Sequence, residues 1–186
     1  MEVIAVRILC FGDSNTYGYD PRSYFGDRYD AEQRWVDLVA SKTGHEMINC
    51  GLNGREIPRN ADVLRLLEKH GSVDLFLVML GTNDLLQGVS AKDAATRMEA
   101  FLQALLPYCS NVLLVSPPPM KRGVWVPSDA LVRESSCLAE EYALVAQKLS
   151  VPFIDTHSWN VELTFDGVHF TETGHHTFAN RLIESF

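Results

Sequence analysis

The chain has 186 residues, of which 46% are hydrophobic and 22% are charged, and its formal net charge is −8. This length is typical of one domain, so we expect a single domain over residues 1–186 that needs no disulfide or metal for stability. The excess of acidic over basic residues argues against a nucleic-acid partner. No apolar run approaches the roughly 20 residues that cross a bilayer. The first residues lack a basic leader before an apolar stretch, so we expect a cytoplasmic protein with no membrane partner.

Short apolar runs alternate with longer amphipathic runs along the chain. The short runs are rich in Val, Ile and Leu without strict polar alternation, as in strands that are buried on both faces. They lie at Val6–Phe11, Glu46–Cys50, Leu75–Leu80, Val112–Val115 and Val151–Ile154. Helical patterns fill the gaps at about 30–44, 60–70, 90–106, 131–149 and 171–183.

Local signals mark the ends of several of these helices. Asp30-Ala-Glu-Gln33 resembles a capping box, and Gly44 stands where a C-cap glycine would stand. Ser90 opens a helix that Pro107 stops, and Thr171 caps the last helix. The four cysteines form no CxxC pair, so we interpret them as small buried hydrophobic residues. They are Cys10, Cys50, Cys109 and Cys137.

Five strands that alternate with five helices predict a parallel sheet in a three-layer α/β/α sandwich. We expect the flavodoxin-like strand order 2-1-3-4-5, in which the first and third strands are neighbours. Ligands bind beyond the carboxyl ends of such strands, which points to the loops 12–18 and 81–88. The irregular stretch Ser116–Pro127 could cover this site, mediate a subunit contact, or pack as an ordinary loop.

Two of the loops carry side chains that suit nucleophilic catalysis. Ser14 directly follows the first strand, where its hydroxyl is exposed and its backbone N–H lies near a helix start. Asn83, in Gly81–Asp84 after the third strand, offers an amide N–H₂ to a developing negative oxygen. Each motif alone also fits a structural role, because Ser, Asp and Asn are common turn and cap residues.

Two further segments complete a possible hydrolytic site. Asn49–Gly54 follows the second strand and contains two glycines whose backbone N–H could approach a substrate oxygen, although either also fits a simple turn. Asp166 and His169 lie three residues apart, where the carboxylate can orient the imidazole as a general base. The four signals together form a complete hydrolytic set.

Other histidines and carboxylates in the same region could bind a metal with Asp166 and His169. They are Asp155, His157, His175 and His176. No HExxH or comparable ligand spacing occurs among them, so we predict no metal site and no cofactor.

The blocks that contain these residues resemble the SGNH hydrolases, also called the GDSL esterase and lipase superfamily. The blocks are ILCFGDSNTYGY at Ile8–Tyr19, the glycine block at Asn49–Gly54, MLGTND at Met79–Asp84 and DGVHFTE at Asp166–Glu172. A further match, VLLVSPPP at Val112–Pro119, is similar to the arylesterase-type members. The resemblance covers essentially the whole chain and implies a serine esterase.

The resemblance also implies a role for individual residues. Ser14 would be the nucleophile, His169 the base, and Asp166 the acid that orients the base. The oxyanion hole would consist of the Ser14 backbone N–H, a glycine N–H and the Asn83 amide. We assign that glycine as Gly54, and Gly51 stays an alternative.

We expect the substrate to be a small-molecule acyl ester, because the chain is short and lacks an obvious long lid. The candidates for substrate binding are Asp13, Asn15, Tyr17, Met120 and Trp125. Asn15 stands where many relatives have Leu, and we expect it to tune the pocket. Acyl transfer to another alcohol or peroxide, and a homo-oligomeric state, stay open.

Alternative functions share parts of this pattern. A carbohydrate O-deacetylase or an acyl thioesterase would use the same triad. A flavodoxin-like module could hold a flavin phosphate at the loop Ser14–Gly18, but the Asp166–His169 pair would then have no role. The intact set of motif residues argues against a catalytically inactive scaffold.

Overall fold

Five parallel strands form one sheet in the order β2-β1-β3-β4-β5, which confirms the predicted topology. The computed structural model describes residues 5–23, 25, 27–58 and 62–186. The strands are β1 (Arg7–Gly12), β2 (Glu46–Gly51), β3 (Leu75–Met79), β4 (Val112–Val115) and β5 (Phe153–Ile154). Each lies within about one residue of its predicted run, except that β5 begins two residues later.

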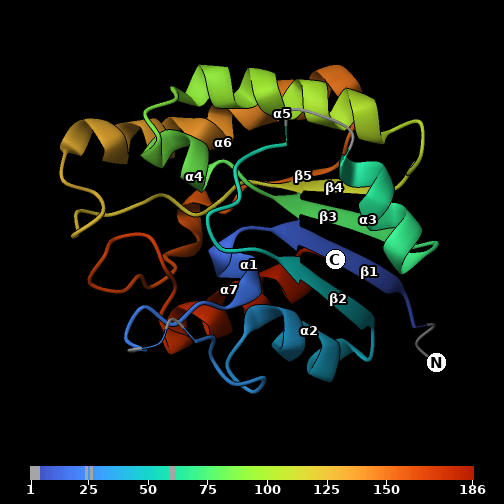
Figure 1. The fold of residues 1–186 in the computed structure, drawn as a ribbon, viewed down its shortest axis with the longest axis horizontal. Helices are drawn as coiled ribbons and strands as arrows, with labels where there is room; N and C mark the ends of the chain where they lie inside the picture. Colours follow the sequence, from blue (N-terminus) through green and yellow to red (C-terminus); the bar gives the residue numbers. More distant parts are fainter. Residues whose placement is uncertain (1–4, 24, 26, 59–61) are drawn as a thin grey trace.

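Helices cover both faces of the sheet (Figure 1). Helices α3, α4, α5 and α6 lie on one face, and α2 and α7 pack against each other on the opposite face. Their bounds are α1 (Ser14–Tyr17), α2 (Trp35–Thr43), α3 (Asp62–His70), α4 (Thr82–Leu86), α5 (Ala91–Leu105), α6 (Asp129–Leu149) and α7 (Glu172–Glu184), with a 3₁₀ turn η1 at His157–Trp159. The predicted start of the helix 60–70 lies outside the described residues.

Most of the predicted helix ends are confirmed. The Ser90 side chain accepts from the Asp93 N–H and caps α5, and Gly44 ends α2 at φ 74°. The Thr171 side chain caps α7 in the same way. The predicted capping box at 30–33 is wrong, because two N–H groups there bond to the Asp30 carbonyl in a turn and α2 begins only at Trp35.

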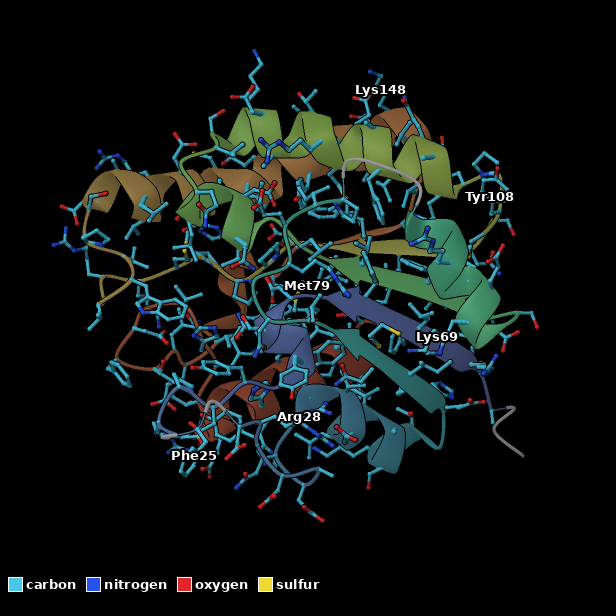
Figure 2. The ribbon with its side chains drawn as sticks, in the orientation of Figure 1. Phe25, Arg28, Lys69, Met79, Tyr108 and Lys148 are labelled. Atoms are coloured by element: carbon cyan, nitrogen blue, oxygen red, sulfur yellow. The ribbon has the colours of Figure 1, made fainter. Side chains whose placement is uncertain are left out.

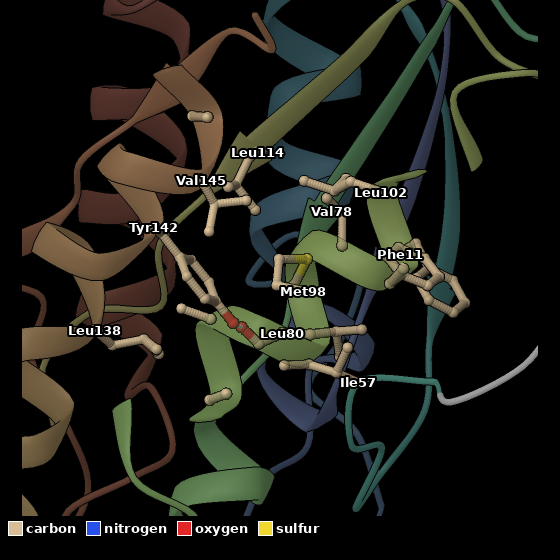
Figure 3. Close-up of a cluster of buried hydrophobic side chains, with 14 of the residues drawn as sticks. Phe11, Ile57, Val78, Leu80, Met98, Leu102, Leu114, Leu138, Tyr142 and Val145 are labelled. Atoms are coloured by element: carbon tan, nitrogen blue, oxygen red, sulfur yellow. Dashed lines mark hydrogen bonds between the residues drawn. The ribbon is translucent and has the colours of Figure 1, made fainter. Parts of the chain in front are cut away.

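Alternate side chains of the central strands enter two separate cores. Leu9 and Phe11 of β1 pack under α5 and α6, whereas Ile8 and Cys10 pack under α2 and α7. Figure 3 shows part of the first core, where the buried Tyr142 hydroxyl donates to the Leu80 carbonyl across 2.9 Å. Burial on both faces explains the continuous apolar runs of β1, β3 and β4.

Three of the four cysteines are buried as expected, but Cys137 is exposed on α6. The described helices include none that is long and apolar enough to cross a membrane. Figure 2 shows Lys69 and Tyr108 at the end of the sheet where the strands begin, and Phe25 on the side away from it. The predicted site residues Ser14, Gly54 and Asn83 follow the opposite, carboxyl ends of β1, β2 and β3.

Candidate active site

The central strand β1 delivers Ser14 to the carboxyl edge of the sheet. The chain turns sharply after Gly12, where an added Cβ would lie 2.0 Å from the Thr16 Oγ1 atom. Asp13 then caps the short helix α1, because its carboxylate accepts from the Asn15 N–H at 2.9 Å. Ser14 is therefore the first residue of a helix that starts directly at the strand end, and it is 5% exposed.

The turn before α7 brings His169 and Asp166 to this serine. His169 Nε2 lies 2.9 Å from Ser14 Oγ, and His169 Nδ1 lies 2.7 Å from Asp166 Oδ2. All three side chains are buried. The structure thus joins two segments 155 residues apart into one continuous chain of hydrogen bonds.

The charge of Asp166 decides which nitrogen of the His169 ring carries the proton. Burial by itself raises the pKa of Asp166, but hydrogen bonds from the His169 ring and from the His169 and Val168 N–H groups outweigh it. The pKa of Asp166 therefore falls to about 2. An ionised carboxylate accepts from Nδ1, which leaves Nε2 free to accept the Ser14 proton.

A second loop, residues 121–125, holds the turn that carries Asp166. The Trp125 N–H donates to the Asp166 carbonyl at 3.0 Å, and the Lys121 N–H donates to the Gly167 carbonyl at 3.0 Å. Gly123 fits so tightly that a Cβ there would lie 2.3 Å from the Asp166 carbonyl carbon. The proline-rich stretch therefore docks backbone to backbone on the Asp166–Gly167 turn.

Asn83 approaches from the neighbouring strand β3. It lies in the first turn of α4, and its Nδ2 donates to the Arg55 carbonyl at 3.0 Å. An amide nitrogen carries two hydrogens, so this bond orients the group and leaves one hydrogen for another acceptor. Asp84 holds the same segment, because its Oδ2 accepts from the Ile57 N–H at 2.9 Å.

The two candidate glycines differ in what their surroundings allow. The Gly51 N–H already donates to Asn49 Oδ1 at 3.0 Å, and Gly51 packs against the backbone of Tyr17. Gly54 is exposed at φ 73°, with nothing within 4 Å of an added Cβ. The geometry therefore favours Gly54 over Gly51 as a backbone donor.

Comparison with known proteins agrees with this geometry. Residues 10–177 match the GDSL-like lipase/acylhydrolase family. The chain belongs to this family. Its membership makes the chain a hydrolase of carboxylic esters, as the four sequence blocks imply.

Solved structures of related enzymes share the whole fold. The native aryl esterase of M. smegmatis is 30% identical, with a TM-score of 0.81 over 97% of this chain and 98% of that one. A carbohydrate acetylesterase family member from Sinorhizobium meliloti is 26% identical, with a TM-score of 0.82 over 96% and 95% of the two chains. None of the curated proteins matches the chain.

Two aromatic rings flank the imidazole of His169. The Trp125 ring lies edge-on to His169 with centroids 5.0 Å apart, and Trp125 is 49% exposed. The Tyr19 ring meets the same imidazole at 4.8 Å. Trp125 therefore lies at the site as expected, whereas the ring of Tyr17 packs against the Arg28 guanidinium instead. Tyr19 takes the place that we predicted for Tyr17.

The remaining candidates for substrate contact, Met120, Asp13 and Asn15, have buried side chains. Met120 is 3% exposed and belongs to the core under α5 and α6, so it forms no open rim. The Asp13 carboxylate is buried as the α1 cap, and burial raises its pKa to about 6 despite the Asn15 N–H and the nearby His169. Asn15 is 4% exposed, and its amide is occupied by backbone partners.

The alternative metal site does not assemble. No group of three or more His, Cys, Asp or Glu residues in the described part of the chain could hold a metal ion. His175 is instead packed between the rings of Tyr29 and Phe170, and its Nδ1 lies 3.4 Å from the Trp35 N–H. Asp155, His157 and His176 are exposed.

Sequence reasoning missed Tyr19, Asp84 and Gly123. The signal for Asp84 was present, because it belongs to the block that supplied Asn83. Tyr19 likewise belongs to the block Ile8–Tyr19 that supplied Ser14. Gly123 carries no comparable local signal, since its contact with Asp166 joins segments more than 40 residues apart.

Proposed function

We propose that the protein is a serine esterase that hydrolyses small carboxylic acyl esters through an acyl-enzyme. The observation that carries this proposal is the unbroken path from Asp166 through His169 to Ser14, with contacts of 2.7 and 2.9 Å. A buried serine with this geometry gains nucleophilicity, because the imidazole accepts its proton as the hydroxyl attacks.

The reaction proceeds in two halves. Ser14 Oγ attacks the ester carbonyl while His169 Nε2 takes its proton, and the resulting imidazolium then protonates the departing alcohol. Water, activated by the same imidazole, next attacks the acyl-enzyme and releases the acid. The ionised Asp166 stabilises the imidazolium in both halves.

The tetrahedral intermediates need donors for their negative oxygen. The Ser14 backbone N–H, the Gly54 N–H and the second hydrogen of Asn83 Nδ2 are proposed to fill this role. Hydrogen bonds from Asn83 to the Arg55 carbonyl and from Ile57 to Asp84 join the Asn83 loop to the segment after Gly54. Donors that are fixed before the reaction need no reorganisation when charge develops.

A serine-directed fluorophosphonate tests this assignment. Such a probe reacts with an activated serine, so trypsin digestion of the labelled protein should place the adduct on the peptide Ile8–Arg22. Ser14→Ala should abolish labelling and ester turnover, whereas the exposed Ser158→Ala should retain both. Labelling on another peptide, or equal labelling of Ser14→Ala, would contradict the proposal.

A series of nitrophenyl esters tests the acyl size. We expect kcat/KM to be highest for acetate and to fall for octanoate, because the proposed site has no long lid to cover a chain. Preference for octanoate would overturn the proposed substrate size while leaving the triad intact. The same assay with added alcohol measures acyl transfer as a competing fate of the acyl-enzyme.

A second candidate is removal of acetyl groups from carbohydrates. The likeness to the Sinorhizobium meliloti carbohydrate acetylesterase family member supports it, as does the half-exposed ring of Trp125 beside the imidazole. An exposed indole offers a flat apolar face to a sugar ring. Higher kcat/KM on an acetylated sugar than on nitrophenyl acetate would favour this candidate.

A further inference from the structure

The side chain of Asn15 connects α1 to the backbone on both sides of His169. Its Nδ2 donates to the Val168 carbonyl at 3.1 Å, and its Oδ1 accepts from the Phe170 N–H at 3.0 Å. Asn15 is 4% exposed, so water competes poorly for either bond. One carboxamide therefore bridges the residues immediately before and after the imidazole.

The chemistry of these partners admits few other side chains. A backbone carbonyl only accepts and an N–H only donates, so the amide of Asn15 has a single orientation. Leu has about the same size but no polar atom, and Asp presents two acceptors, one of them against the Val168 carbonyl. A neutral amide of this length satisfies both partners at once.

The backbone of Asn15 is itself held in place. Its N–H donates to Asp13 at 2.9 Å, and its carbonyl accepts from the indole N–H of the fully buried Trp35 at 3.0 Å. These bonds fix the start of α1, and the Asn15 side chain holds the segment around His169 to it. We call the two hydrogen bonds of the Asn15 amide, to Val168 and Phe170, the clamp. Ser14 lies on the same helix start as Asn15, so the clamp connects the segment of the nucleophile to the segment of the base.

The segment around His169 belongs to no helix or strand and contains one isolated antiparallel bridge, between Leu163 and Phe170. It lies between η1 and α7, where the Thr164 N–H bonds to the His169 carbonyl and the 121–125 turn holds the residues 165–167. Neither of these contacts comes from α1. The amide of Asn15 supplies the side-chain bonds that join α1 to the backbone of this segment.

We propose that Asn15 is a positioning residue that keeps His169 Nε2 at hydrogen-bond distance from Ser14. The inference rests on the proposed esterase function and adds a residue that acts through His169 without touching the substrate. A misplacement of about 1 Å in such an arrangement costs on the order of 10²-fold in rate.

The test compares Asn15→Leu, Asn15→Asp and Thr156→Val. Asn15→Leu should lower kcat for nitrophenyl acetate by about 10- to 100-fold with KM within about twofold, because a transition-state arrangement is lost and ground-state binding is kept. Asn15→Asp keeps the acceptor for Phe170 and adds a charge near His169, so the acid limb of its pH–rate profile should move up by about one unit. Thr156→Val removes a comparable buried bond, to the Ser116 carbonyl, and should lower thermal stability without either kinetic effect.

A proton NMR measurement separates this proposal from the esterase assignment. The His169 Nδ1 proton, held against Asp166, should give a downfield resonance that exchanges faster with water in Asn15→Leu than in the wild type or Thr156→Val. An unchanged resonance and an unchanged kcat in Asn15→Leu would contradict the positioning role of Asn15.

If Asn15→Leu does not fold, Asn15→Asp provides the test. An unmoved pH profile and an unchanged resonance in Asn15→Asp would then contradict the positioning role. Absence of fluorophosphonate labelling in the wild type would refute the esterase function instead, and the resonance would still test the clamp.

Discussion

Asn83 illustrates how one side chain combines a structural and a chemical role. Its amide donates one hydrogen to the Arg55 carbonyl, and the other is available to a reacting oxygen. The first bond fixes the direction of the second. The sequence supplied the residue type, but only the contact with Arg55 explains why the amide is oriented before substrate arrives.

Replacement of Asn83 should weaken turnover without abolishing it. We expect Asn83→Ala to lower kcat by roughly 10²–10³-fold, because one of three proposed oxyanion donors is lost. The measurement is kcat on nitrophenyl acetate, with the exposed Asn180→Ala on α7 as a matched control. If kcat of Asn83→Ala falls by less than about tenfold, Asn83 is not an oxyanion donor.

At the level of elements, the docking of two loops sets the position of Asp166, the proposed catalytic acid. The turn 121–126 contributes no side chain to the triad, yet its N–H groups bond to the carbonyls of residues 165–167. A glycine at 123 is required by this close approach, since backbone atoms fill the space of a side chain. The loop therefore acts as a brace for Asp166.

Gly123→Ala should displace this brace. The new methyl would meet the Asp166–Gly167 backbone at 2.3–2.4 Å, so one of the loops must move and the Asp166 carboxylate with it. We expect a lower melting temperature and a kcat reduced by about tenfold or more. Gly44→Ala, whose Cβ meets nothing within 4 Å, carries only the cost of its positive φ and should leave kcat unchanged. An unaltered kcat in Gly123→Ala would show that the brace does not position Asp166.

For the whole molecule, buried titratable groups make stability depend on pH in opposing directions. Burial lowers the pKa of His175 to about 3 from 6.5, so the unfolded chain binds this proton more readily and stability falls as pH decreases below 6.5. The lowered pKa of Asp166, about 2 against 3.8, acts in the same sense at lower pH. The raised pKa of Asp13, about 6 against 3.8, opposes the His175 effect between about 4 and 6, because there the folded chain binds the Asp13 proton more readily.

The His175 contribution can be isolated by substitution. The difference in unfolding free energy between wild type and His175→Phe should change by about 2–3 kcal/mol between pH 7 and 4.5 in favour of the variant, because Phe has no proton to bind. Chemical denaturation at several pH values measures this difference. A pH-independent difference for His175→Phe would contradict the assignment.

The sequence by itself predicted the sheet order, the strand positions and the three side chains, Ser14, Asp166 and His169, that the fold brings into hydrogen-bond contact. Apolar runs without alternation report burial on both faces, and strand order then places the loops after β1 and β3 together. The motifs around Ser14, Asn83 and Asp166 are local, so each is readable in a few letters.

Only the tertiary structure decided which other side chains reach the site. The ring of Tyr19 meets the His169 imidazole, Met120 is buried in the core, and the Asn15 amide bonds to the backbone of Val168 and Phe170. These outcomes depend on contacts between segments far apart in the chain, whose energies are set by packing and by the hydrogen bonds left to satisfy. Neither residue type nor spacing encodes which buried amide meets which backbone group.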